Sequence, residues 1–166
     1  MTDTAFSIDG AGPPVVLLHG LGLTHAVWDQ QLPALTSAFR VLRYDLLGHG
    51  ESVKHRGAYA MDQFVDQLDK LLDSLALENT SLVGFSLGGM IARAYTIARP
   101  KRVSALIILN SPHDRTEDER NAVRARAKQA LAAGPAATVE AALERWFTSS
   151  FAAANPEVLD QVRKVL

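Results

Sequence analysis

Residues 82–90 read Leu-Val-Gly-Phe-Ser-Leu-Gly-Gly-Met, and they are the most informative stretch of the chain. They contain the pattern Gly-x-Ser-x-Gly over 84–88, directly after an apolar run and directly before a run that favours a helix. This pattern is typical of a strand that ends in a sharp turn and continues as a helix, with the serine at the apex. Glycine flanks the serine because a Cβ at either position would crowd the strand or the helix. The sequence therefore predicts that Ser86 is presented as a nucleophile at the end of a strand.

Two other strand-like runs also end in glycine-rich turns, and the first of them is entirely apolar. Residues 15–18 lead into His-Gly-Leu-Gly at 19–22, and residues 40–44 lead into Asp-Leu-Leu-Gly-His-Gly-Glu-Ser at 45–52. Each turn is followed by a predicted helix, and strands that alternate with helices indicate βαβ units and a parallel sheet. The functional loops of such a sheet lie at the carboxyl ends of its strands.

The periodicity of the apolar residues predicts the other elements. The clearest helix is 60–76, because its apolar residues recur at i, i+3 and i+4 and form one face that docks on the sheet. Further strands are predicted at 5–8, 80–85 and 105–109. Further helices are predicted at 25–37, 86–99, 117–133, 138–151 and from 156 onward, with Asn155 as the cap of the last one.

The turn at 19–22, the loop at 45–52 and the elbow at 84–88 stand in the order and spacing of the α/β-hydrolase family, which the chain resembles over essentially its whole length. The resemblance implies an α/β fold with a mostly parallel sheet flanked by helices, here incomplete and with the start of a helical cap. It also implies the chemistry of small carboxylesterases, enol-lactone hydrolases and cofactor-free haloperoxidases. Residues 144–148, Glu-Arg-Trp-Phe-Thr, are most similar to the enol-lactonase branch.

The composition changes after Pro112, where the chain becomes rich in Ala, Arg and Glu and loses its strand signals. We expect residues 1–114 to form the N-terminal part of the hydrolase core. By the resemblance, residues 115–166 are a truncated helical cap, or lid, that roofs the active site.

The sheet and the last helix both look unfinished. In the resembled family two more strands follow the cap and bring the catalytic acid and histidine. In this chain, the last predicted helix has no stop signal before Leu166. We therefore expect an N-terminal portion of a hydrolase, the alternative being a complete but shortened protein. Without a neighbour, strand 105–109 would be an exposed sheet edge through which the chain could self-associate.

A serine hydroxyl attacks an acyl group only when a base removes its proton and N–H groups stabilise the oxyanion. The resemblance places the two oxyanion-hole donors at the backbone N–H groups of Leu21 and Leu87. The alternative role for Ser86, a helix cap after a strand, fits the flanking glycines less well.

A convincing partner histidine for Ser86 is missing. We expect His19 and His49 to be structural residues of their turns, and His25 and His55 to be exposed helix or loop residues. His113 follows strand 105–109 at the functional end of the sheet, so it is the one candidate for the base.

Four other side chains are site candidates. Asp114 is a candidate acid, with helix capping or solvation as the favoured alternative. Asp45 is not counted among the four, because it is expected to brace its own loop. Trp28, Phe85 and Trp146 are candidates for the substrate pocket, although packing of its helix is the favoured role of Trp28.

The composition excludes several classes of protein. The 166 residues suffice for one compact domain, and 48% hydrophobic with 21% charged residues is ordinary for a globular protein. A net charge of −1 gives no basic field for nucleic acid, and no apolar run approaches the length of a membrane helix. There is no cysteine, and no His/Asp/Glu cluster has metal-ligand spacing. We expect a cytoplasmic protein without metal, cofactor, nucleic-acid partner or membrane association.

These observations favour a serine hydrolase that cleaves a small-molecule carboxylic ester or lactone through an acyl-Ser86 intermediate. Because the triad is incomplete, residues 1–166 alone are expected to give little or no turnover. Two alternatives remain open: a cofactor-free haloperoxidase or perhydrolase, and a non-catalytic remnant that binds an acyl compound. A haloalkane dehalogenase is disfavoured, since its nucleophile is a carboxylate.

Overall fold

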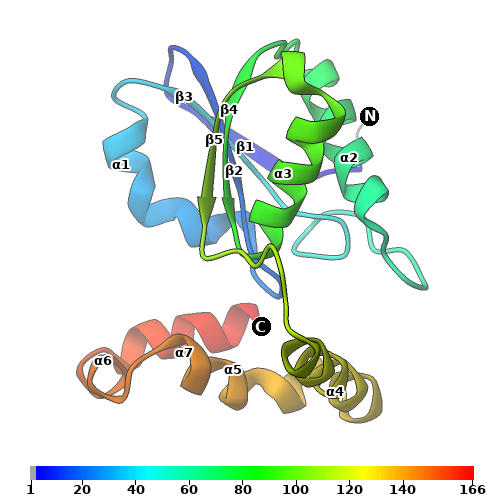
Figure 1. Cartoon of the computed structure of the whole chain (residues 1–166). Helices are drawn as coiled ribbons and strands as arrows, with labels where there is room; N and C mark the ends of the chain where they lie inside the picture. The colour runs from blue at the N-terminus through cyan, green and yellow to red at the C-terminus, as the bar shows by residue number, and fades with distance from the viewer. Residues whose placement is uncertain (1–2) are drawn as a thin grey trace. The chain divides into compact units, whose positions relative to one another are not determined.

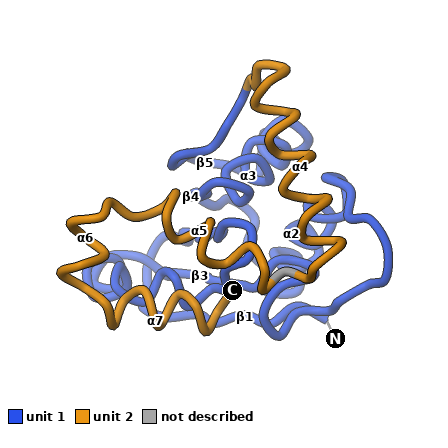
Figure 2. Tube along the Cα trace, turned by 90° about the horizontal axis from the view of Figure 1, so that it is seen from below, with its two compact units in different colours: residues 1–113 blue, residues 114–166 orange. Residues whose placement is uncertain are grey.

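The computed structural model describes residues 3–166 and divides into two compact units, one ending at His113 and the other beginning at Asp114 (Figure 2). The first unit contains the sheet and the helices that cover it. The second unit is helical.

The first unit is built on a five-stranded sheet (Figure 1). Its strands are β1 Phe6–Asp9, β2 Pro14–Leu18, β3 Arg40–Tyr44, β4 Thr80–Phe85 and β5 Val103–Leu109. The spatial order is β1-β3-β2-β4-β5, with β1 antiparallel to β3 and the other pairs parallel. The carboxyl ends of β2, β3, β4 and β5 therefore lie at one edge, and the predicted α/β class with a mostly parallel sheet is confirmed.

Helices cover both faces of this sheet (Figure 1). Helices α2 Met61–Ser74 and α3 Leu87–Ala98 lie on one face, with the short 3-10 helix η2 Pro100–Arg102 after α3. On the other face lie the 3-10 helix η1 His25–Gln31 and the single turn α1 Leu32–Leu35. The continuous helix predicted for 25–37 is therefore wrong. Pro33 is tolerated only in the first turn of an α-helix, so the α-helix begins at Leu32 and the residues before it are wound as a 3-10 helix.

The core has two apolar clusters, one on each side of the sheet. The larger includes the buried face of α2, whose apolar members are Phe64, Val65, Leu68, Leu71 and Leu72. These are residues of the predicted i, i+3, i+4 stripe. The smaller cluster consists of Val15, Leu17, Trp28 and Val41.

A charged network centred on Asp69 joins α2 to α3 and η2. The Asp69 carboxylate accepts hydrogen bonds from the Tyr95 hydroxyl at 2.9 Å, from Arg99 Nε at 3.1 Å and from Arg102 at 2.8 Å. Partial burial raises the pKa of Asp69, but the hydrogen bond from Tyr95 and the two guanidinium groups outweigh it and hold that pKa below its usual value.

We expect Asp69→Asn to lower the free energy of unfolding by about 2 kcal/mol at pH 7, because hydrogen bonds to a charged group are lost. A carboxyl whose folded pKa is depressed contributes stability above its unfolded pKa of about 4, and this contribution disappears as the pH falls through the folded pKa. Urea unfolding of both proteins at pH 7 and pH 3 should therefore show a difference that shrinks in acid. Asp66→Asn, at an exposed position of the same helix, is the control and should show neither effect.

Strand β5 is an edge strand of the described sheet, and it pairs only with β4. Its sequence, Val-Ser-Ala-Leu-Ile-Ile-Leu, is apolar on both faces, as in strands covered on both sides. Ile107, Ile108 and Leu109 are nevertheless exposed, Ile107 by 49%. The exposed edge expected for 105–109 is thus present.

The second unit contains α4 Glu117–Ala133, η3 Pro135–Thr138, α5 Val139–Trp146, α6 Ser149–Ala154 and α7 Pro156–Val165. The single helix predicted for 138–151 is wrong, because the Thr148 hydroxyl accepts a hydrogen bond from the Phe151 N–H and caps a new helix. Asn155 precedes α7 but does not cap it through its side chain, which donates to the Phe151 carbonyl instead. Within residues 3–166, no helix is both long enough and apolar enough to cross a membrane.

Candidate active site

Ser86 lies on a sharp turn between β4 and α3. Its backbone has φ 53° and ψ −112°, in the region of positive φ that residues with a side chain rarely adopt. Two neighbours hold it there: the Ser86 N–H donates to the Leu109 carbonyl at 3.0 Å, and the Gly89 N–H donates to the Ser86 carbonyl at 3.1 Å. Such strain costs on the order of 1–3 kcal/mol and persists only where the surroundings impose it. The strand, turn and helix predicted for residues 82–90 are confirmed.

The flanking glycines allow three backbone segments to meet at this turn. A Cβ at Gly84 would lie 2.4 Å from the Gly88 carbonyl oxygen, and a Cβ at Gly88 would lie 2.3 Å from the carbonyl oxygen of Leu18 at the end of β2. Neither backbone oxygen can move without separating α3 from the sheet. The Gly-x-Ser-x-Gly pattern is therefore a steric requirement of this packing.

The turn after β2 lies beside Ser86. A Cβ at Gly20 would be 3.4 Å from the Ser86 Cβ, and the Leu23 N–H donates to the Gly20 carbonyl across the turn at 3.2 Å. Gly22 supplies the positive φ of 76° that the turn requires. We refer to residues 20–24 as the oxyanion turn, after the role that the sequence predicts for it.

The backbone N–H groups of Leu21 and Leu87 make no hydrogen bond with the described residues. Leu87 begins α3, and the first N–H groups of a helix have no acceptor within it. Leu21 is 67% exposed at the tip of the oxyanion turn. Both amides are therefore available as donors to a ligand.

His19 is fully buried and joins the oxyanion turn to the loop after β3. Its Nε2 accepts a hydrogen bond from the Leu46 N–H at 3.0 Å, so the proton is on Nδ1, which lies 2.8 Å from the Gly20 carbonyl oxygen. Burial lowers the pKa of His19 to about 4, and the ring is neutral at pH 7. The ring of His49 meets that of His19 edge-on at a centroid distance of 5.2 Å. His49 Nδ1 lies 2.9 Å from the Leu47 carbonyl oxygen, so the rings of both histidines bond to the backbone of the loops, which agrees with the structural role expected for them.

Asp45 is a buried carboxylate that connects two loops. Its Oδ2 accepts a hydrogen bond from the Glu51 N–H at 2.9 Å, so it braces its own loop as expected. Its Oδ1 accepts two more, from the His25 N–H at 2.7 Å and from His25 Nδ1 at 2.8 Å. Burial raises the pKa of Asp45, but the hydrogen bonds from His25 and Glu51 outweigh it and hold that pKa below its usual value.

His25 begins η1 as a helix residue, but the expectation that it is exposed is wrong, since its side chain is only 26% exposed and is hydrogen-bonded to Asp45. The contact spans 20 residues of sequence, and no local pattern indicates it.

No histidine of the described residues hydrogen-bonds to the Ser86 hydroxyl. His113 is exposed at the end of the first unit. Asp114 belongs to the second unit, where its exposed carboxylate lies 3.6 Å from Arg120. The loop between β5 and His113 is held by Arg93, which donates to the Pro112 carbonyl at 2.9 Å.

The three aromatic pocket candidates lie in different surroundings. Trp28 is buried in the smaller core cluster, and the half-buried Phe85 packs against that cluster. The Phe85 ring is also the nearest neighbour of a Cβ added at Gly20, at 3.1 Å. Trp146 ends α5 in the second unit and is 43% exposed.

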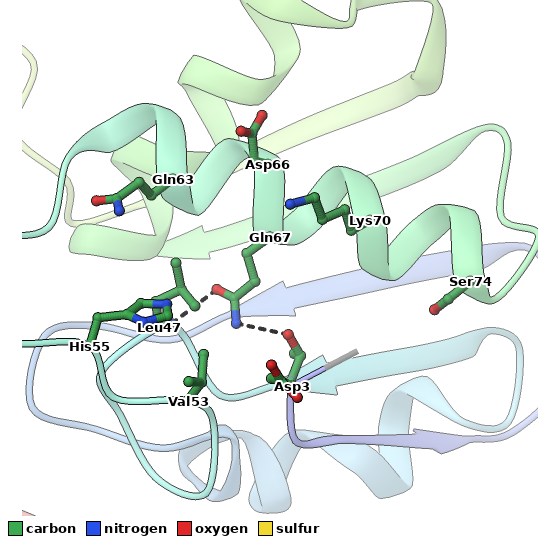
Figure 3. Close-up of a pocket in the computed structure, with 10 residues that line it drawn as sticks. Asp3, Leu47, Val53, His55, Gln63, Asp66, Gln67, Lys70 and Ser74 are labelled. Carbon is green, nitrogen blue, oxygen red and sulfur yellow. Dashed lines mark hydrogen bonds between the residues drawn. The ribbon is translucent and has the colours of Figure 1, made fainter. Parts of the chain in front are cut away.

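A cavity of about 620 Å³ lies between the N-terminal segment, the loop after β3 and α2 (Figure 3). None of the predicted site residues lines it. Gln67 extends from α2 into its wall and accepts a hydrogen bond from the Leu47 N–H at 3.0 Å (Figure 3). Its side-chain amide also donates to the Asp45 carbonyl at 3.0 Å. Gln67 therefore supports the loop that carries Asp45. Among the described residues, no group of three or more His, Asp or Glu side chains could hold a metal ion.

Comparisons with known proteins agree with this architecture. Residues 13–155 match the model of the alpha/beta hydrolase fold family. The chain is 33% identical over 141 residues to (E)-2-((N-methylformamido)methylene)succinate hydrolase of Acinetobacter baylyi. The matched residues make up 85% of this chain and 53% of that protein. Among solved structures, the enol-lactonase from Burkholderia xenovorans superposes with a TM-score of 0.90 at 32% identity, covering 98% of this chain and 63% of the other.

The bromoperoxidase from Bacillus anthracis superposes with a TM-score of 0.87 at 26% identity, again covering 98% of this chain and 63% of the other. The chain thus spans little more than half of the curated relative and less than two thirds of either solved chain.

Proposed function

The chain belongs to the α/β-hydrolase family, and on that premise we propose that Ser86 is the nucleophile of a hydrolase that cleaves a carboxylic ester or lactone through an acyl-serine intermediate. The observation that carries the proposal is the backbone of Ser86, which keeps a positive φ at the carboxyl edge of a parallel sheet. The sheet places the serine where the loops of such folds act on ligands.

In the proposed reaction the Ser86 Oγ attacks the acyl carbon while its proton passes to a base. The tetrahedral oxyanion accepts hydrogen bonds from the Leu21 and Leu87 N–H groups, neither of which has a hydrogen-bond partner among the described residues. When the oxyanion collapses, the bond to the leaving oxygen breaks and that oxygen takes up the proton. Water then attacks the acyl-Ser86 ester and releases the acid.

None of the described histidines hydrogen-bonds to the Ser86 hydroxyl, and a serine hydroxyl without such a base is a poor nucleophile. We therefore propose that residues 1–166 alone give little or no turnover. His113 and Asp114 stay candidates for the base and the acid, in the loop after β5.

The pocket is proposed to form around Phe85 and Trp28 on the core side. Residues 115–166, including Trp146, are proposed to act as the cap. The name of one similar protein, an enol-lactonase, supports a small lactone or related ester as the substrate. The exposed apolar edge of β5 supports self-association of the chain.

Covalent trapping tests the nucleophile without turnover. The chain is incubated at pH 8 with an alkyl fluorophosphonate and with imidazole as an external base, and the intact mass and peptide masses are measured. We expect one phosphonyl adduct, on the peptide that carries Ser86, and none in Ser86→Ala. An adduct on another residue, or equal labelling of Ser86→Ala, would show that Ser86 is not the nucleophile.

A second candidate is a cofactor-free haloperoxidase or perhydrolase, in which peroxide in place of water accepts the acyl group. The superposition on a bromoperoxidase favours it as an alternative. Peroxide-dependent bromination that exceeds ester hydrolysis and is lost in Ser86→Ala would select it.

A further inference from the structure

The oxyanion turn is anchored at both of its ends to the loop after β3. At the first end, the His19 ring accepts from the Leu46 N–H. At the second end, His25 donates two hydrogen bonds to one oxygen of Asp45, from its backbone N–H at 2.7 Å and from its ring Nδ1 at 2.8 Å. Since Asp45 and Leu46 are adjacent, both anchors end on one short segment.

That segment is itself firmly held. The Asp45 carbonyl accepts hydrogen bonds from the Ser52 hydroxyl at 2.6 Å and from the Gln67 side chain at 3.0 Å. The other carboxylate oxygen of Asp45 accepts from the Glu51 N–H. Both carboxylate oxygens and the carbonyl of Asp45 are therefore hydrogen-bonded, so Asp45 is a well-held attachment point for the neighbouring turn.

We propose that His25 is a positioning residue, whose ring bond to Asp45 holds the oxyanion turn so that the Leu21 N–H faces the oxyanion formed at Ser86. The proposal rests on the proposed function of Ser86 and goes beyond it by assigning a role to His25. The carboxylate can only accept hydrogen bonds, so Nδ1 carries the proton and the ring is oriented.

The position of the Leu21 amide matters because an oxyanion donor acts only at about 2.7–3.1 Å from the oxygen that becomes charged. Three residues, 22–24, separate Leu21 from the His25 anchor, and the Leu21 side chain is exposed. Within the turn, the hydrogen bond from the Leu23 N–H to the Gly20 carbonyl, at 3.2 Å, is at the upper end of the usual range. The two anchors therefore determine where the turn lies.

His25→Ala removes the ring bond and leaves the backbone bond to Asp45. His25→Asn keeps a side-chain N–H donor close to the position of Nδ1 and is the conservative variant. His55→Ala is the matched control, because His55 lies farther along the loop after β3, away from Asp45 in the sequence, and its contacts are with Tyr59 and not with the oxyanion turn.

Two measurements on the full chain test the proposal. Amide hydrogen exchange, followed by NMR on ¹⁵N-labelled protein, should be about tenfold faster at Leu23 in His25→Ala and unchanged at Leu68 in the core. The maximal rate of Ser86 labelling by the fluorophosphonate should fall about 10- to 100-fold, with the half-saturating concentration unchanged, because the turn contacts the phosphoryl oxygen only in the transition state. His25→Asn should recover most of both effects, and His55→Ala should match the wild type.

The outcomes separate the two proposals. Unchanged exchange at Leu23 in His25→Ala would overturn the anchor itself. Faster exchange with an unchanged labelling rate would make His25 a structural residue only. A wild-type chain that is never labelled at Ser86 would overturn the proposed function, and with it any catalytic meaning of the anchor, whatever the exchange result.

Discussion

Gly88→Ala is expected to lower the free energy of unfolding by about 3 kcal/mol, the upper end of the usual cost of overpacking. The added methyl group would lie 2.3 Å from the Leu18 carbonyl oxygen and 2.7 Å from that of His19. Both are backbone atoms next to the oxyanion turn, so α3 must move away from β2. The higher helix propensity of alanine returns about 1 kcal/mol at most. Because a domain of this size is stable by only about 5–15 kcal/mol, the loss is large.

Urea unfolding followed by circular dichroism measures this effect. Gly20→Ala is the matched control, because its methyl group would meet the Phe85 ring at 3.1 Å, a side chain that can shift. We expect the control to lose less than about 1 kcal/mol. Equal midpoints for the two variants would contradict the close approach of α3 to β2. Gly88→Ala should also lose fluorophosphonate labelling of Ser86, since the turn that presents the serine cannot keep its geometry.

Ester hydrolysis by residues 1–166 is expected to stay at the background level of Ser86→Ala until a base is supplied. Removing the triad base from a serine hydrolase lowers kcat by a factor on the order of 10⁶. Added imidazole can take the proton from the Ser86 hydroxyl, because no described residue hydrogen-bonds to it. The rate of p-nitrophenyl butyrate hydrolysis by the wild type should then exceed that of Ser86→Ala by an amount that grows with imidazole concentration.

Subtracting the Ser86→Ala rate at each imidazole concentration is essential, since imidazole itself hydrolyses activated esters. Two results would change the interpretation. A Ser86-dependent rate without imidazole would mean that the chain carries its own base, and His113→Ala would then be the next variant. Equal rates for wild type and Ser86→Ala at every imidazole concentration, together with retained binding of an acyl compound, would favour the non-catalytic remnant.

The strands, the two main helices of the first unit and the turn at Ser86 could be predicted because their signals are local. The stripe on α2 repeats within one helix, and each apolar strand is followed directly by its glycine-rich turn. The glycines at 84 and 88 also indicate that other backbone atoms pack closely against this turn, although the sequence does not show which atoms these are. The helices predicted at 25–37 and 138–151 differ from the structure because a new helix starts inside each of these segments. Pro33 lies in the first turn of α1, and Thr148 caps α6.

By itself, the amino-acid sequence determined the fold class, the order of the strands along the chain, and the serine at the end of β4, since short-range sterics and periodicity specify all three. Only the tertiary structure decided how the loops at the carboxyl edge hold one another. Asp45 meets His25 across 20 residues, Leu46 meets His19 across 27, and Gln67 reaches back to Asp45 across 22. Such contacts depend on which strands lie side by side, and hydrogen bonds between distant residues leave no periodic trace in the sequence.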